Sequence, residues 1–324
     1  MRAVLCREWG PPESLVIEDL PSPEPGKDEV VISVRAANVS FANILAIAGR
    51  HQNQQQRPFS PGGEVAGVIK AVGENVSAFM AGDAVVGLGK RGGCAEEVIA
   101  SAASLRHIPA GMDFKIAVAS GSSYSTSLYA LRERGRLQPG ETLLVLGASG
   151  GVGLAAVELG KLMGARVIAC ASTQEKLDLC QRYGADELIN YQTENLRDAV
   201  KRLTGDQGVD VVYDPVGGDY AEPALRGMAW GGRYLVVGFA AGAIPKIPLN
   251  LALLKGCSIV GVWIGGLQAR DPAANSRFLD ELMNMVQAGT LKPCVSAAYS
   301  LDHTVDALND LKSRKVTGKI VIVP

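Results

Sequence analysis

The sequence predicts an α/β protein in which a doubly wound parallel sheet is joined to a partly open β-barrel domain. Two observations carry this prediction. From about residue 113 onward, short apolar strands alternate with helical segments, which is typical of right-handed crossovers in a parallel sheet. Before that point the chain shows only short β-rich runs broken by Gly and Pro. The length of 324 residues, about twice that of a usual domain, agrees with two domains.

The expected barrel is assembled from both chain ends. Its first strands are predicted at residues 29–35, 64–69, 83–86 and 97–100. The tail is expected to hold helices at 271–288 and 302–311 and a closing strand at 319–323. Because the first part forms an incomplete barrel, we expect the tail to return to it. The predicted domains are therefore residues 1–121 with 264–324, and residues 122–263.

The middle of the chain supplies the elements of the parallel sheet. Its strands are predicted at residues 143–146, 166–170, 188–189, 209–213 and 234–237, with an edge strand at 259–264. Helices are expected after the first strand and at residues 174–183, 194–203 and 221–228.

Composition excludes several classes of function. Apolar residues make up 47% of the chain and charged residues 20%, as in folded proteins. A net charge of −1 gives no basic surface for nucleic acid or an anionic membrane. The longest uncharged stretches are shorter than the roughly 20 residues of a membrane span. Charge also returns too early after Met1 for a signal peptide. We expect a cytoplasmic protein with a small-molecule substrate and no nucleic-acid or membrane partner.

The cysteines are widely scattered, and no C-x-x-C pair occurs among them. This pattern predicts neither a disulfide framework nor a cysteine-rich zinc site, but reduced and mostly buried thiols. The six residues are Cys6, Cys94, Cys170, Cys180, Cys257 and Cys294.

A glycine-rich turn follows the first strand of the predicted sheet. Gly147, Gly150 and Gly153 are spaced three apart, and Gly151 adds a fourth glycine. Glycine allows a tight turn and lets backbone N–H groups approach a pyrophosphate at the positive end of the next helix. A purely structural turn is the alternative. The second strand and its helix, in the places expected for a dinucleotide site, favour nucleotide binding.

The end of the second strand indicates which dinucleotide is bound. An NAD site places Asp or Glu there to bind the ribose 2′-hydroxyl, but residues 170–173 contain no acid. Ser172 and Lys176 offer a hydroxyl and a cation, which would bind a 2′-phosphate. The sequence therefore favours NADPH over NADH. The alternative for Lys176 is a solvated lysine on a helix face.

Motifs along the whole chain resemble one superfamily. They lie at residues 58–68, 72–73, 82–87, 138–141, 147–153, 183–186, 214–218 and 318–321. The sequence resembles the medium-chain dehydrogenase/reductase superfamily, in its zinc-independent NADPH:quinone oxidoreductase branch. The resemblance implies a Rossmann domain that binds NADPH and a GroES-like barrel domain. It also implies a hydride transfer from NADPH to a quinone or a related α,β-unsaturated carbonyl.

The resemblance also implies which residues surround the cofactor. Tyr191 and Arg314 join Ser172 and Lys176 around NADPH, while Tyr124 and Thr126 face the nicotinamide carboxamide. The other expected contacts are in the glycine-rich turn and in the segment against the nicotinamide. They are Gly147, Ser149, Gly150, Gly151, Val152 and Gly153, and Gly238, Phe239 and Ala240.

Zinc-dependent relatives bind the catalytic metal with a Cys and with a His in a G-H-E motif. The matching positions are Ser40 and Gly63, and the region of the structural zinc lobe keeps only Cys94. A hydroxyl and a glycine do not replace thiolate and imidazole. We expect no metal.

Hydride transfer needs a donor near the oxygen on which negative charge grows. The candidates are Ser40, Asn43, His51 and Tyr124, all near the expected join of the two domains. Related reductases often have Asn and Asp at the first two positions, so proton delivery is left open.

His51 has a second interpretation, because 2-enoyl thioester reductases of the superfamily carry a catalytic Tyr near this place. An exposed loop histidine is the plainer alternative. The function is thus predicted as quinone reduction, with enoyl thioester reduction as one alternative. A non-catalytic NADPH-binding protein is the other.

The predicted edge strand at residues 259–264 is apolar and uncharged. A bare edge of this kind promotes aggregation, and relatives pair it with its copy across a two-fold axis. We expect a homodimer, and a Pro at Val260 or Val262 is expected to disrupt it.

Overall fold

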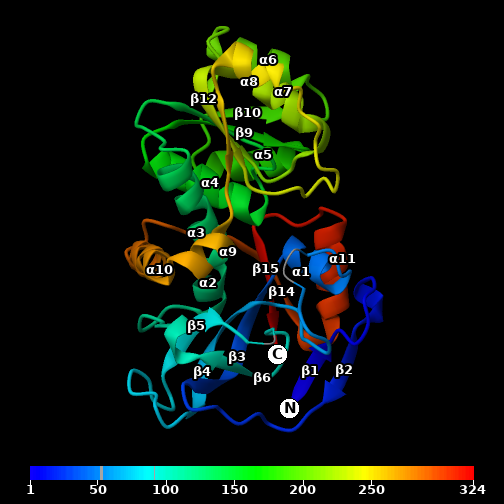
Figure 1. Cartoon of the computed structure of the whole chain (residues 1–324), viewed down its shortest axis with the longest axis vertical. Coiled ribbons are helices and arrows are strands. Elements are labelled where there is room, and N and C mark those ends of the chain that lie inside the picture. The colour runs from blue at the N-terminus through cyan, green and yellow to red at the C-terminus, as the bar shows by residue number, and fades with distance from the viewer. Residues whose placement is uncertain (52–53, 91) are drawn as a thin grey trace. The chain divides into compact units, whose positions relative to one another are not determined.

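The computed structural model describes residues 1–51, 54–90 and 92–324 (Figure 1). The chain forms two compact units, Met1–Ser122 with Asp280–Pro324, and Ser123–Leu279. The chain first passes from one unit to the other at 122/123, one residue after the boundary at 121/122 expected from the sequence. The return falls at 279/280 rather than 263/264. Phe278 explains this difference, because its ring is buried beside Tyr129 and Arg132 of the second unit, with centroid distances of 6.3 and 4.9 Å.

The first unit is the expected barrel-like sheet, with strand order β14-β15-β3-β4-β5-β7 and β6 also paired with β3. The tail strand β15 is antiparallel to β3, with Ile320 opposite Val39, so both chain ends build one sheet (Figure 1). The strands of this sheet are β3 (Glu29–Val39), β4 (Glu64–Val72), β5 (Ala84–Leu88), β6 (Glu97–Ser101), β7 (Leu105–His107), β14 (Val295–Ser300) and β15 (Lys319–Val323). In the same unit, β1 (Arg2–Leu5) and β2 (Val16–Asp19) form a separate antiparallel pair.

Short helices cover this sheet on its two faces. On one face, Ile32, Val65 and Ile320 are buried together with Leu308 of the tail helix. On the other, Ala36, Val321 and Val118 pack together. Strand side chains alternate between the two faces of a sheet, so β3 contributes apolar residues to the core on each face. The helices of this unit are α1 (Phe41–Ile47), α2 (Phe114–Ala119) and α11 (Thr304–Lys312).

The second unit is the expected doubly wound sheet. All its strand pairs are parallel, in the order β10-β9-β8-β11-β12-β13. The strands are β8 (Thr142–Val145), β9 (Arg166–Ala171), β10 (Glu187–Asn190), β11 (Val209–Asp214), β12 (Met228–Val236) and β13 (Ser258–Gly261). The helices are α3 (Ser122–Leu128), α4 (Gly151–Leu162), α5 (Gln174–Arg182), α6 (Leu196–Thr204), α7 (Ala221–Arg226), α8 (Asn250–Lys255), α9 (Ile264–Arg270) and the first half of α10 (Pro272–Gln287), which continues into the first unit from Asp280.

The order of the strands reverses direction at β8. The chain runs outward through β9 and β10 on one side and returns through β11, β12 and β13 on the other. Leu143, Leu144, Val211 and Val212 are fully buried, as expected of central parallel strands covered on both faces. Ligands of such sheets bind at the carboxyl ends of the strands next to this reversal.

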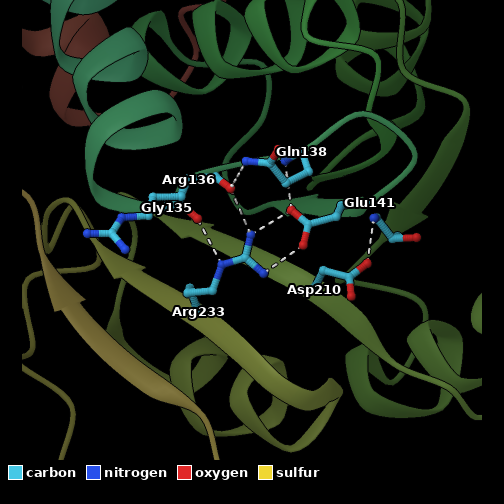
Figure 2. A network of polar contacts seen from close by, with 7 residues as sticks. Gly135, Arg136, Gln138, Glu141, Asp210 and Arg233 are labelled. Atoms are coloured by element: carbon cyan, nitrogen blue, oxygen red, sulfur yellow. Dashed lines mark hydrogen bonds and ion pairs between the residues drawn. The ribbon is translucent and has the colours of Figure 1, made fainter.

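The turn before β8 is fastened to β12 by one arginine (Figure 2). Arg233 donates to both carboxylate oxygens of Glu141, at 2.8 and 2.5 Å, and to the carbonyl oxygen of Gly135 at 2.8 Å. The N–H of Gln138 also donates to Glu141 at 2.8 Å. Beside this pair, Asp210 of β11 accepts from the N–H of Thr142. The start of β8 is thereby tied to both strands that follow it in the sheet.

The edge strand is shorter than the sequence suggests. β13 ends at Gly261, and Ile264, expected at the end of the strand, begins α9 instead. The ring of Trp263 lies against Gly265 and Gly266, where an added Cβ would meet it at 3.0 and 2.6 Å. The two glycines thus give the indole room to pack on the first turn of α9. Among the residues that the structure describes, none of the helices combines the length and apolar character that crossing a membrane requires.

Candidate nucleotide-binding site

The first turn of α4 is built to receive an anion. Gly150 is its N-cap residue and provides no side-chain acceptor. Leu154 is the first residue whose N–H bonds back, to the Gly150 carbonyl at 2.8 Å, so the N–H groups of Gly151, Val152 and Gly153 have no acceptor within the helix. Free N–H groups and the positive end of the helix dipole fit a pyrophosphate.

Two of the glycines are required by this turn. Gly147 has φ of +56°, which favours glycine. A Cβ on Gly153 would lie 2.3 Å from the Gly147 carbonyl oxygen, and one on Gly147 would lie 2.7 Å from Cγ2 of Val216. The turn after β8 therefore packs closely against the turn after β11, at the place where the strand order reverses.

Asp214 fixes that second turn. Its Oδ1 accepts from the N–H groups of Val216 and Gly217 at 2.7 and 2.8 Å, and its Oδ2 accepts from the hydroxyl of Tyr234. Burial raises the pKa of Asp214 although these hydrogen bonds oppose the shift. The carboxyl is thus enclosed by the protein and serves the geometry of the turn.

The residues expected at the 2′-phosphate come together at the ends of β9 and β10. The ammonium of Lys176 donates a hydrogen bond to Oγ of Ser172 at 3.4 Å. The N–H of Tyr191 donates to the Ala171 carbonyl at 3.2 Å, beside the register pair Asn190 and Ala171. The ring of Tyr191 lies 4.4 Å from that of Tyr220. A hydroxyl and a cation therefore meet at the end of β9, and an aromatic ring follows the end of the neighbouring strand β10.

The segment expected against the nicotinamide lies at the same edge of the sheet. The N–H of Gly238 donates to the Asp214 carbonyl at 3.2 Å, and that of Ala240 to the Pro215 carbonyl at 3.1 Å. A Cβ on Gly217 would lie 2.9 Å from the ring of Phe239. Residues 238–240 are thus held next to the reversal of the strand order.

Tyr124, one of the expected proton donors, lies on α3. It is buried, and its hydroxyl donates to Oε2 of Glu158 in α4 at 2.6 Å. A phenol has one proton, and here a carboxylate accepts it. Ser127, three residues after Tyr124 on α3, donates its hydroxyl to the Val152 carbonyl at 2.9 Å. Thr126, which lies between them in the sequence, is half-buried. The geometry favours an anchoring role for Tyr124, in a contact with Glu158 that the sequence did not predict.

The remaining expected residues belong to the first unit. Oδ1 of Asn43 accepts from the N–H and hydroxyl of Ser40, at 2.7 and 3.3 Å, so the two residues close the N-terminus of α1 on each other. His51 donates its backbone N–H to the Leu45 carbonyl at 3.1 Å. Arg314, with φ of +58°, lies in the turn after α11. Their roles in catalysis and cofactor binding stay predictions.

Ser40 and Gly63 stand where zinc-dependent relatives bind their metal. The described ranges, 1–51, 54–90 and 92–324, hold no group of three or more His, Cys, Asp or Glu placed to bind a metal. Cys94 is buried, and burial raises the pKa of its thiol. Its sulfur lies 3.0 Å from a Cβ built on Gly62, which fits the packing role expected of it.

Comparison with known proteins identifies the family. Residues 26–110 match the alcohol dehydrogenase GroES-like domain, and residues 151–281 match the zinc-binding dehydrogenase family. The quinone oxidoreductase-like protein 2 homolog of Nematostella vectensis is 41% identical over 325 residues, which cover 99% of this chain and 88% of that protein. The chain belongs to the quinone oxidoreductase-like branch of the medium-chain dehydrogenase/reductases.

Solved structures of this reductase superfamily agree. The Escherichia coli quinone oxidoreductase complexed with NADPH matches with a TM-score of 0.94 and 27% identity, over 100% of both chains. CurK enoyl reductase matches with a TM-score of 0.89 and 26% identity, over 99% of this chain and 98% of that one. The Rossmann and GroES-like architecture predicted for this medium-chain reductase is confirmed.

Proposed function

We propose that this chain is an NADPH-dependent oxidoreductase that reduces a quinone or a related α,β-unsaturated carbonyl. The observation that carries the proposal is the pairing of two features in one unit. The first turn of α4 offers uncapped N–H groups beside the strand reversal, and the end of β9 presents Ser172 and Lys176 in place of an acid. The NADPH complex of the Escherichia coli relative supports the same cofactor.

The parts of the site have distinct tasks in this proposal. Bound NADPH supplies the hydride. The N–H groups of residues 151–153 hold the pyrophosphate, and Ser172 and Lys176 hold the 2′-phosphate. Phe239 and its neighbours orient the nicotinamide. The proposed donor toward the oxygen of the substrate is Ser40, because its hydroxyl donates to Asn43 over a long 3.3 Å, whereas the hydroxyl of Tyr124 donates to Glu158 at 2.6 Å.

Enoyl thioester reduction is the second candidate, favoured by the likeness to CurK enoyl reductase and by the imidazole of His51. A turnover screen of quinones, simple enones and enoyl-CoA thioesters with NADPH separates the candidates. We expect NADPH oxidation with quinones or enones. Turnover of enoyl-CoA alone would favour the second candidate, and tight NADPH binding without any turnover would indicate a non-catalytic binding protein.

We also propose that the protein is a cytoplasmic homodimer paired through β13. The backbone N–H of Val262 donates to the Val236 carbonyl of β12 at 2.9 Å. Backbone N–H and C=O groups point to alternate sides along a strand, so those of Ile259 and Gly261 point away from β12. Arg134 already donates to the Gly261 carbonyl at 3.1 Å. The open part of the edge is therefore centred on Ile259. The side chains of Trp230 and Leu253, 79% and 78% exposed, add an apolar surface in this unit.

A further inference from the structure

The chain leaves the first unit at a single helix. α2 ends at Ala119, and α3 begins at Ser122, the last residue of the first unit before the crossing. The rest of α3 belongs to the second unit, where Tyr124 and Ser127 bond to α4. Whatever fixes Ser122 therefore fixes the start of the helix that enters the nucleotide-binding unit.

Glu64 holds that start. Its Oε1 accepts from the N–H of Ser122 at 2.5 Å, and its Oε2 accepts from the hydroxyl of Ser122 at 2.6 Å and from the amide of Asn38 at 2.7 Å. A Cβ on Gly121 would lie 2.2 Å from Oε1, so the carboxylate lies directly against the backbone of the crossing. A negative group at the first turn of a helix satisfies an orphan N–H and complements the helix dipole.

A lysine on the same sheet balances the charge of Glu64. Asn38 on β3 lies opposite Glu64 on β4 and opposite Val321 on β15. Lys319 precedes Val321 by two residues, so Lys319 lies on the same face of the sheet as Glu64. Lys319 is only 6% exposed. Burial lowers the pKa of Lys319, and the charge of Glu64 opposes that shift. A buried ammonium needs such a partner, because removal from water disfavours its charged form.

Asn38 shows that this arrangement is specific. Its amide nitrogen donates to Glu64, while its Oδ1 is enclosed without a hydrogen-bond partner in the part of the chain that the structure describes. An unsatisfied buried acceptor costs free energy, because it gives up its hydrogen bonds to water without replacing them. The side chain of Asn38 therefore keeps its hydrogen bond to Glu64 while its Oδ1 stays without one.

We propose that Glu64, with Lys319 as its counter-charge, is a positioning residue that fixes Ser122 and thereby the start of α3. Through α3 it would hold Tyr124 and Thr126 in register with α4. Only the kinetic consequence of this proposal rests on the proposed function. The placement of α3 is measurable without any substrate.

Hydrogen exchange of the segment 120–128, with Glu64→Gln against Glu97→Gln, tests the proposal. Glu97 is the matched control, since its carboxylate in the same unit also accepts from a serine hydroxyl, that of Ser22, and has a lysine, Lys70, as its counter-charge. A glutamine cannot accept from all three donors that Glu64 serves. We expect Glu64→Gln to raise exchange in residues 120–128 by about tenfold, and Glu97→Gln to leave it unchanged.

Binding and turnover give the second readout. We expect Glu64→Gln to lower kcat by about tenfold and to leave the Kd of NADPH nearly unchanged, because the phosphate contacts lie elsewhere. Lys319→Met should act in the same direction, and the double variant should be no worse than Glu64→Gln, since the two residues act as a unit. Ser122→Ala, which removes one hydrogen bond, serves if Glu64→Gln does not fold.

Equal exchange of residues 120–128 in the Glu64 and Glu97 variants would overturn the proposal. So would a rise spread evenly over the first unit, which indicates stability alone. If no substrate is turned over by the unmodified protein, the proposed function fails, but the exchange experiment still decides the role of Glu64.

Discussion

Lys176 is the residue on which the choice of cofactor depends most directly. Its ammonium meets Ser172 at the end of β9, where a 2′-phosphate would add a charged hydrogen bond. Lys176→Ala is expected to weaken NADPH binding by about 1 to 3 kcal/mol and to spare NADH, which lacks that phosphate. Fluorescence titration of both nucleotides measures the effect. Lys201→Ala is the control, because Lys201 of α6 is exposed and forms a 3.3 Å ion pair with the exposed Asp206. Equal losses for both nucleotides would contradict the assignment.

Ser40 and Gly63 predict how the protein behaves toward metals. Neither side chain is a zinc ligand, and the hydroxyl of Ser40 bonds to Asn43. The purified protein is expected to contain no stoichiometric zinc by elemental analysis, and chelators should leave its activity unchanged. One tightly bound zinc per chain would show that other residues form a metal site.

Single residues show how far the sequence leads at this scale. The glycine turn and the group around Lys176 were predictable, because their members follow strands of one parallel sheet and must meet at its edge. The contact of Tyr124 with Glu158 was not predictable, because Glu158 lies on a different helix. Glu64 and Ser122 are 58 residues apart. Only the packing of the elements reveals such pairs, since no periodicity links them.

At the scale of elements, the Arg233–Glu141 pair ties β12 to the turn before β8. Burial would raise the pKa of Glu141, but the hydrogen bonds from Arg233 and the Gln138 N–H outweigh it, and the pKa is lowered. A lowered pKa stabilises the fold above the unfolded pKa of about 4.3, and this stabilisation is lost as the pH falls through the folded value.

Glu141→Gln should therefore lower the free energy of unfolding at neutral pH by about 1 to 3 kcal/mol, since both side chains are mostly buried, at 21% and 22% exposed. The difference from the unmodified protein should shrink as the pH falls below the unfolded pKa of about 4.3, and should be lost once the pH has passed the lowered pKa of Glu141 in the folded protein. Urea denaturation at several pH values measures it. Glu194→Gln, which loses an exposed pair with Arg202, should change little. A deficit independent of pH would contradict the account.

Elements whose ends depend on side-chain packing were predicted least well. The apolar run at residues 259–264 has the composition of a strand along its whole length, yet the indole of Trp263 packs on two glycines and starts α9. The return between units was placed too early for a similar reason. The rings and guanidinium around Phe278 decide it, and no change of composition marks them.

The assembly of the whole molecule is tested at the β13 edge. Val262 bonds within its own sheet, and by alternation Val260 does so too, so a Pro at either position would damage the subunit itself. Ile259→Pro instead removes an outward N–H. Light scattering of the unmodified protein should give twice the 33.9 kDa of one chain, and Ile259→Pro should give monomers that still bind NADPH. A monomeric unmodified protein would contradict the homodimer.

The central claim is that the chain delivers a hydride from NADPH to a conjugated carbonyl. Its most direct test uses NADPH deuterated at C4 of the nicotinamide, prepared as each of the two C4 epimers, together with a simple enone. We expect one epimer to transfer its deuterium to the β-carbon of the product, detected by mass spectrometry, with NADH a much poorer donor. NADPH that binds tightly but passes deuterium to no enone, and is oxidised by no quinone, would contradict it.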